Sequence, residues 1–154
     1  MTARWSHEPN GYECPFCAVV RGDDNAPFTV RDDIVLRDTK TTAWIGSRWW
    51  QHNAGHVIVV PNDHVENIYA LDGSAAAAIH QSAKRIAVAM KRAYNCDGIS
   101  TRQHNEPGGD QEIWHYHLHV FPRYIGDGLY GAPWRDTTPD ERRPYAELLR
   151  EALR

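Results

Sequence analysis

Three histidines alternate with other residues in the segment His115-Tyr116-His117-Leu118-His119-Val120-Phe121. Alternate side chains of a β-strand share a face, so the three imidazoles are predicted to line one side of a strand about 7 Å apart. Tyr116, Leu118 and Val120 are then expected on the opposite face, packed into the core. A neutral imidazole is a nucleophile, a proton carrier or a metal ligand near neutral pH, because its unperturbed pKa is about 6.5.

This histidine face has three interpretations. It is a half-exposed strand only if an uncommon residue fills three successive outward positions by chance. It is a catalytic zinc site if His-x-His supplies metal ligands. It is a nucleophilic site for phosphoryl transfer if one ring nitrogen donates a hydrogen bond, which fixes the tautomer, while the other nitrogen attacks.

Cys14 and Cys17 form a second chemical pattern, the spacing Cys-x-x-Cys. Two thiolates supply half of a tetrahedral structural zinc site, whereas two incidental thiols would have no such role. With only three cysteines in 154 residues, a disulfide framework is not predicted, and we expect a reducing, cytoplasmic location. Cys96 is expected to be a small packed side chain near the end of a helix.

The composition excludes several classes of protein. A length of 154 residues fits one domain, and 42% hydrophobic and 24% charged residues are typical of an ordinary globular chain. The net charge is −3, so no broad basic surface is available and no stable nucleic-acid partner is expected. No apolar run approaches the roughly 20 residues that cross a bilayer, so no membrane partner is expected.

Hydrophobic patterns and turn residues predict the elements that position these groups. Strands are predicted at residues 34–37, 41–46, 56–60, 98–104 and 113–121. Helices are predicted at residues 74–94, with Ser74 as N-cap, and at residues 140–153. Residues 1–27 are expected to be irregular, as are the loops 48–55 and 105–110. Together these elements predict an α+β fold with an antiparallel sheet of about five strands, one long helix and a C-terminal helix.

Each predicted helix has an apolar stripe at helical spacing. The stripe of the long helix consists of Ile79, Ala83, Ile86 and Met90. The stripe of the C-terminal helix consists of Tyr145, Leu148, Leu149 and Leu153. Trp49 and Trp50 lie in the loop before His56, where they are candidates for contact with substrate or with a partner subunit.

The histidine segment, followed by Pro122-Arg123, resembles the signature of the histidine triad (HIT) superfamily. The segment Gly55–His64 resembles the family's Gly-His-hydrophobic-Pro-x-x-His motif. Cys14 and Cys17 resemble the zinc-containing bacterial branch, which includes nucleotide-binding proteins and diadenosine polyphosphate hydrolases. The resemblance covers residues 12–130, so residues 1–154 are interpreted as a single HIT domain with a C-terminal extension, 131–154, that contains the last helix.

The resemblance implies that His117 attacks the α-phosphorus of a nucleotide conjugate and forms a nucleotidyl-histidine intermediate. His119 is then a second catalytic residue, which donates to a phosphate oxygen or to the leaving group. His56, Asn105 and Gln111 are implied substrate-binding residues. The substrate is expected to be a purine nucleotide conjugate, either a dinucleoside polyphosphate or a nucleoside phosphoramidate. A nucleotide-binding regulatory protein with little turnover is the alternative.

The resemblance also assigns His64 and His115 as the third and fourth ligands of a structural Zn²⁺, and it implies a homodimer. Two positions depart from the family pattern. Arg48 stands where relatives often carry an acid that holds the ribose. Glu112 stands near the expected phosphate, where a carboxylate would repel an anion unless it is paired.

Overall fold

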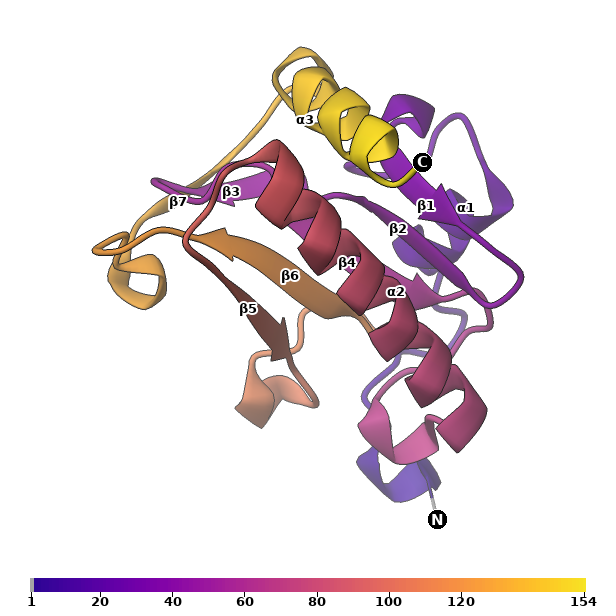
Figure 1. The fold of residues 1–154 in the computed structure, drawn as a ribbon. Coiled ribbons are helices and arrows are strands. Elements are labelled where there is room, and N and C mark those ends of the chain that lie inside the picture. The colour runs from indigo at the N-terminus through magenta and orange to yellow at the C-terminus, as the bar shows by residue number, and fades with distance from the viewer. Residues whose placement is uncertain (1) are drawn as a thin grey trace.

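A five-stranded antiparallel sheet forms the centre of the computed structural model, which describes residues 2–154 (Figure 1). The spatial order of its strands is β1 (Ile34–Arg37), β2 (Thr41–Ile45), β4 (Val57–Pro61), β6 (Leu118–Arg123) and β5 (Gly98–Gln103). Every neighbouring pair is antiparallel. The α+β class and the number of strands predicted from the sequence are therefore confirmed.

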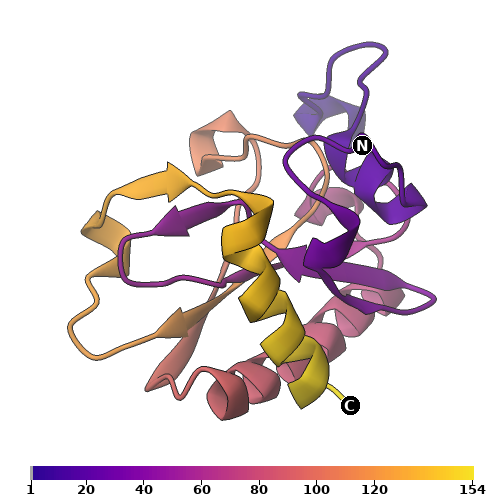
Figure 2. The same cartoon turned by 90° about the horizontal axis from the view of Figure 1, so that it is seen from above.

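Two helices pack on one face of this sheet, as Figures 1 and 2 show from perpendicular directions. The long helix α2 (Gly73–Ala93) lies across β2, β4 and β6, and the C-terminal helix α3 (Pro139–Ala152) lies beside it over β1 and β2. The predicted stripe of α2 is fully buried. Its N-cap is Asp72 rather than Ser74, because the Asp72 carboxylate accepts from the backbone N–H of Ala75.

Helix α3 begins one residue earlier than predicted, in a capping box formed by Thr138 and Glu141. Its buried face includes Leu149 and Ala146, but Leu148 is exposed, which corrects the predicted stripe. The face is rotated because the buried Arg142 occupies part of it. Among residues 2–154, no helix has both the length and the apolar character needed to cross a membrane.

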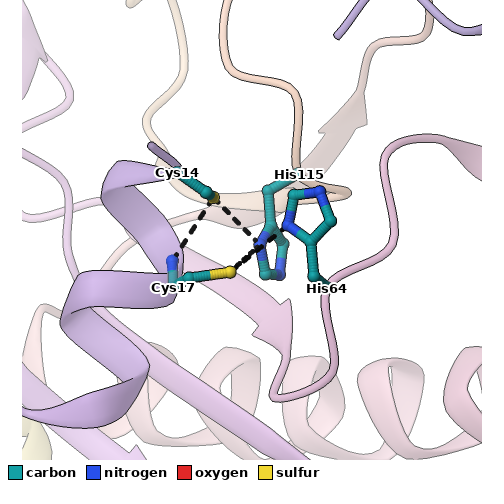
Figure 3. A group of neighbouring side chains, drawn as sticks. All are labelled: Cys14, Cys17, His64 and His115. Atoms are coloured by element: carbon teal, nitrogen blue, oxygen red, sulfur yellow. Dashed lines mark hydrogen bonds between the residues drawn. The ribbon is translucent and has the colours of Figure 1, made fainter. Parts of the chain in front are cut away.

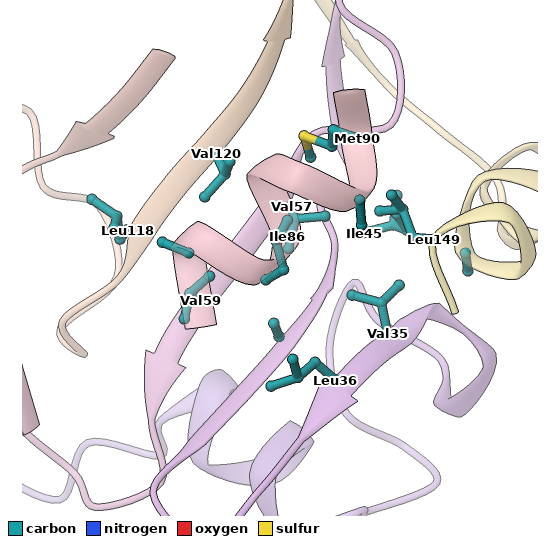
Figure 4. Close-up of a cluster of buried hydrophobic side chains, with 14 of the residues drawn as sticks. Val35, Leu36, Ile45, Val57, Val59, Ile86, Met90, Leu118, Val120 and Leu149 are labelled. Carbon is teal, nitrogen blue, oxygen red and sulfur yellow. The ribbon is translucent and has the colours of Figure 1, made fainter. Parts of the chain in front are cut away.

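Both faces of the sheet are buried near β4. Val57 and Val59 belong to the hydrophobic cluster under α2 and α3 (Figure 4). Ile58 and Val60 point to the other face, where they form a second cluster that includes Phe16. The run of four aliphatic residues thus forms a strand covered on both sides, as predicted.

The N-terminal segment is more regular than the sequence suggested. It contains a short helix at Thr2–Trp5 and the helix α1 (Pro15–Arg21), which is capped by the Cys14 side chain. This segment covers the face of the sheet opposite α2 and α3 (Figure 2). Further single-turn 3₁₀ helices lie at Arg31–Asp33, Ile68–Ala70, Pro107–Gly109 and Leu129–Gly131.

The predicted loop 48–55 begins with a strand. Residues Arg48–Trp50 form β3, which pairs antiparallel with β7 (Trp134–Asp136) in a separate two-stranded sheet. Trp49 is buried, its indole N–H donates to the Gly46 carbonyl at 2.9 Å, and its ring lies against Tyr145. Trp49 is therefore a core residue, and only Trp50 faces the histidines.

Strand β6 starts at Leu118, five residues later than predicted. The residues before Leu118 do not pair with a neighbouring strand, because the backbone N–H of Tyr116 donates to the Val65 carbonyl in a neighbouring loop. The alternation of faces nevertheless continues through this segment. Tyr116, Leu118 and Val120 lie in the cluster under α2, as predicted.

A buried ion pair joins α3 to the residues that precede β1. Arg142 donates through Nε and Nη2 to the two carboxylate oxygens of Asp33, at 2.9 Å each. Both side chains are almost inaccessible, with 3% and 1% of their surfaces exposed. This fork geometry satisfies both charges and places α3 against the sheet.

We expect Arg142→Met to lower the free energy of unfolding by about 3–5 kcal/mol, because the substitution leaves the Asp33 carboxylate buried without a cation. The matched control is Arg143→Met, which removes an exposed pair with Asp140 and should cost less than about 1 kcal/mol. Denaturant unfolding measures both values. Equal losses in the two variants would contradict this account of the buried pair.

Candidate active site and metal cluster

His117 has one ring nitrogen committed and one free. Its Nδ1–H donates to the backbone carbonyl of His115 at 2.7 Å, and a carbonyl can only accept, so Nδ1 carries the proton. The lone pair is therefore on Nε2, which is the nitrogen that must be unprotonated for nucleophilic attack. Phe16 lies edge-on against the ring, with centroids 5.1 Å apart.

The three histidines are not on an outward, solvated face, which corrects the sequence expectation. His115 and His117 are buried, and Phe16 of the N-terminal segment lies edge-on against both rings, whereas His119 is partly exposed. Burial lowers the pKa of His115 and of His117 to about 4 each. It also lowers the pKa of His119 well below its ordinary value. All three rings are therefore uncharged at neutral pH.

His119 lies beside His117, and His56 lies beside His119, on the same side of the sheet. The ring of His119 is 5.1 Å from that of His117 and 5.4 Å from that of His56, centroid to centroid. Burial lowers the pKa of His56 to about 3. The Nδ1 atoms of His56 and His119 are buried and have no hydrogen-bond partner within residues 2–154. Two further imidazoles on the His117 side of the sheet thus have unused hydrogen-bonding capacity.

His56 owes its position to a glycine and to two aromatic rings. It stacks on Phe121, with centroids 4.6 Å apart, and Trp50 lies edge-on at 5.7 Å. Gly46 faces the other side of the imidazole so closely that an added Cβ would lie 2.4 Å from ring atoms of His56. No local pattern in the sequence indicates this role of Gly46.

Asn105 and Gln111 lie in the loop beside the histidines, but their amides are engaged within the protein. Asn105 accepts from the backbone N–H of Ile68 and exchanges two hydrogen bonds with Gln103. Gln111 donates to the carbonyls of Glu66 and Ile113 and accepts from the Glu106 N–H. Both side chains therefore hold the loop in shape, and direct contact with phosphate stays a prediction.

The two departures from the family pattern lie against each other. Arg48 donates to Glu112 at 3.0 Å, and its guanidinium lies over the ring of Trp134, 3.9 Å from the centroid. The Glu112 carboxylate is thus paired, which removes the expected repulsion of an anionic substrate. Arg48, the cation of this pair, itself occupies the position where relatives often carry an acid, so no carboxylate stands there.

Cys14, Cys17, His64 and His115 come together in the structure (Figure 3). One ligand atom from each lies within 4.8 Å of all the others. The Cys14 Sγ–His115 Nδ1, Cys17 Sγ–His64 Nδ1 and Cys17 Sγ–His115 Nδ1 distances are 3.4, 3.2 and 3.5 Å. A tetrahedral zinc ion at ordinary bond lengths holds its ligand atoms about 3.5 Å apart, so the cluster fits this ion.

In both histidines of the cluster, the ring nitrogen that faces away from the thiols contacts an oxygen of the protein. His115 Nε2–H donates to the Pro61 carbonyl at 2.9 Å, which leaves the lone pair on Nδ1, facing the thiols. His64 Nε2 contacts the Glu8 carboxylate at 2.5 Å. Such outer contacts orient metal-bound imidazoles in known sites. No role was predicted for Glu8 or Phe16 from the sequence, where only their proximity to the cysteine pair could have indicated one.

Glu66 links this cluster to the loop 104–111. Its carboxylate accepts from the Ser6 hydroxyl and from the backbone N–H groups of His7 and Glu8, while its backbone carbonyl accepts from Gln111. Glu66 also follows the ligand His64 by two residues. The N-terminal segment, the metal cluster and the histidine loop are thus joined through one residue.

A search of family models matches the HIT domain over residues 31–126. The chain belongs to the HIT family. A curated relative, "Protein hit" from Bacillus subtilis, is 31% identical over 132 residues, covering 85% of this chain and 84% of that protein. A crystal structure of a zinc-bound histidine triad family protein from Mycobacterium smegmatis has a TM-score of 0.76 and 28% identity, over 92% of this chain and 93% of that one.

Two other proteins similar to this chain have names that state an activity. The Arabidopsis thaliana adenylylsulfatase HINT3 is 25% identical over 120 residues, which cover 78% of this chain and 57% of that protein. The diadenosine triphosphate hydrolase of Plasmodium falciparum shares the fold, with a TM-score of 0.69 at 15% identity over 80% of this chain and 77% of that one.

We expect Gly46→Ala to displace the His56 ring, because the new methyl group overlaps an imidazole that is already stacked on Phe121. Overpacking of this kind costs about 1–3 kcal/mol. Denaturant unfolding measures the loss, and imidazole NMR signals report the displacement of His56. The control is Gly98→Ala, where an added Cβ meets nothing within 4 Å; similar losses in both variants would rule out close packing as the role of Gly46.

Proposed function

We propose that this HIT protein is a nucleotide hydrolase or nucleotidyl transferase that cleaves a nucleotide conjugate at its α-phosphate, with His117 as nucleophile. The observation that supports this most is the hydrogen bond from His117 Nδ1–H to the His115 carbonyl. It presents an unprotonated Nε2 from a ring that burial keeps neutral. The reaction needs both features, because a protonated imidazole has no lone pair to attack phosphorus.

The proposed reaction has two steps. In the first, a bond forms from His117 Nε2 to the α-phosphorus while the bond from phosphorus to the leaving group breaks and its electron pair departs with that group. In the second, a water oxygen or another acceptor attacks phosphorus, and the electron pair of the P–N bond returns to Nε2. The nucleoside monophosphate is released, the acceptor's proton passes to solvent, and His117 is neutral again.

The neighbouring groups have assigned roles in this proposal. His119 lies 5.1 Å from His117, ring to ring, and donates to a phosphate oxygen or to the leaving group. His56 binds the same phosphate region from the other side of His119. Asn105 and Gln111 act with their loop as substrate-binding residues. Preorganised donors of this kind stabilise the charge that develops on the phosphate oxygens.

We assign a structural Zn²⁺ to Cys14, Cys17, His64 and His115. A site with four protein ligands has no open position for water or substrate, so the ion would stabilise the N-terminal segment against the sheet rather than take part in the reaction. The same geometry disfavours the alternative of a zinc hydrolase that uses the triad as ligands. His117 and His119 lie outside this metal cluster, the one cluster found among residues 2–154.

The remaining proposals concern partners and location. The substrate is a purine nucleotide conjugate of one of two classes, a dinucleoside polyphosphate or a nucleoside phosphoramidate. β5 lies at the edge of the five-stranded sheet, so its outer side is available to pair with β5 of a second copy in a homodimer. We place the protein in the cytoplasm, without a membrane or nucleic-acid partner.

We expect His117→Asn to abolish turnover of diadenosine polyphosphates and adenosine phosphoramidate and to retain nucleotide binding. Asparagine keeps a polar side chain near the substrate but has no nucleophilic nitrogen. Steady-state kinetics and calorimetric binding of AMP measure the two properties, and His80→Asn on the exposed face of α2 is the control. A protein that binds AMP but turns over neither substrate in its wild-type form would be the regulatory alternative, and an active His117→Asn variant would exclude His117 as the nucleophile.

We expect the purified protein to contain one zinc ion per chain and Cys14→Ser or Cys17→Ser to lose it, with a lower melting temperature. A serine hydroxyl is a much poorer zinc ligand than a thiolate. Metal analysis by mass spectrometry and thermal unfolding measure these effects. Cys96→Ser, outside the cluster, should keep its zinc. Zinc retained in both Cys14→Ser and Cys17→Ser would instead favour ligation by the triad.

A further inference from the structure

Arg102 is a charged residue beside the histidines that the reaction above does not use. It lies on β5 directly opposite His119 on β6. Directly opposed residues of antiparallel strands project to the same face with their Cβ atoms about 4.5–5.5 Å apart. Arg102 therefore lies on the histidine side of the sheet, next to His119.

Two aromatic rings hold the guanidinium in this position. Its central carbon lies 4.9 Å from the ring centroid of Trp50 and 4.9 Å from that of Phe121. Phe121 stacks against both His56 and His119, and Trp50 lies edge-on to His56. The positive charge of Arg102 is thus fixed at the border of the His56–His119 pair.

Within residues 2–154, Arg102 has no ion-pair partner; the Asp110 carboxylate favours its charged form, but burial outweighs this and lowers the pKa of Arg102. No carboxylate within residues 2–154 forms an ion pair with it, and its Nε is buried without a hydrogen-bond partner there. The nearby imidazoles are uncharged, and they cannot offset the charge. A partly buried cation of this kind is costly unless an anion pairs with it, so its surroundings suit a bound anion.

We propose that Arg102 binds the leaving group of the substrate and selects conjugates whose leaving group is an anion, such as a nucleoside polyphosphate. This inference rests on the function proposed above. A guanidinium offers two parallel N–H donors to the oxygens of one phosphate. When the bond to the α-phosphorus breaks, negative charge increases on the leaving oxygen, and Arg102 stabilises it beside His119.

The two substrate classes differ in this group. A dinucleoside polyphosphate releases a phosphate-terminated anion, whereas a nucleoside phosphoramidate releases a neutral amine. Arg102 can pair with the first and has no charge to pair with in the second. The structure thus favours dinucleoside polyphosphates, or other conjugates with an acidic leaving group, as the substrate class.

The test compares kcat/KM for diadenosine triphosphate and adenosine 5′-phosphoramidate in the wild-type protein, Arg102→Gln, Arg102→Met and Arg102→Lys. The ratio of the two values, diadenosine triphosphate over phosphoramidate, should fall about 10–100-fold in Arg102→Gln, the effect of losing one charge-assisted contact. Arg102→Met, which keeps the apolar stem against the aromatic rings, should show the same fall. Arg102→Lys should restore part of the ratio. Arg92→Gln, on the exposed face of α2, should leave it at the wild-type value.

An unchanged ratio in Arg102→Gln and Arg102→Met would overturn the role of Arg102, even if both rates fell together. A wild-type protein that cleaves both substrates would in that case still support the proposed function. A wild-type protein that cleaves neither substrate would instead overturn the function itself, and the selectivity with it. Thermal unfolding of each variant shows which rates belong to folded protein.

Discussion

Two backbone carbonyls set the chemistry of the histidine segment. The carbonyl of Pro61 accepts from His115 Nε2–H, and the carbonyl of His115 accepts from His117 Nδ1–H. Two imidazoles two residues apart therefore hold opposite tautomers. His115 turns its Nδ1 lone pair toward the cysteine thiols, while the Nε2 lone pair of His117 remains free for a substrate. The same residue type thus presents Nδ1 in one position and Nε2 in the other, because each ring meets a different main-chain oxygen.

The sheet keeps these two rings in an environment of low polarity. Helices α2 and α3 cover one face of the sheet, and the N-terminal segment covers the other. Each residue of β4 is therefore buried on whichever face it points to. Burial is the largest cause of the lowered pKa values of His56, His115 and His117. Neutral imidazoles at physiological pH are therefore a consequence of how the layers pack, and no acid in direct contact with His56 or His117 is needed to tune them.

The periodic parts of the fold could be predicted from the sequence, and the parts made by distant contacts could not. Helix α2 and strand β4 follow from apolar residues at helical spacing and from a run of aliphatics, which are local signals. β3 pairs with β7 across more than eighty residues through three residues each, and Arg142 meets Asp33 across 109 residues. The spacing of Cys14 and Cys17 indicated two of the metal ligands, whereas His64 and His115 were implied only by the family resemblance; the four side chains come together. Of the triad, only His119 lies within β6, and His115 and His117 precede it. Tertiary packing brings Phe16 against His115 and His117, Glu8 against His64, and Arg102 opposite His119. No local pattern in the sequence predicts these contacts.

Helix α1 has one feature with a consequence for both sites. In the sequence, Phe16 lies between the two cysteines of the metal cluster, and its ring lies edge-on against both His115 and His117. An ion that holds Cys14 and Cys17 would therefore also hold Phe16 against the His117 ring. Through thermodynamic linkage the relation is reciprocal: a nucleotide that binds better when Phe16 is held in this position must tighten the retention of the ion by the same factor. Under the proposed function, the metal site would in this way affect nucleotide affinity without taking part in the reaction.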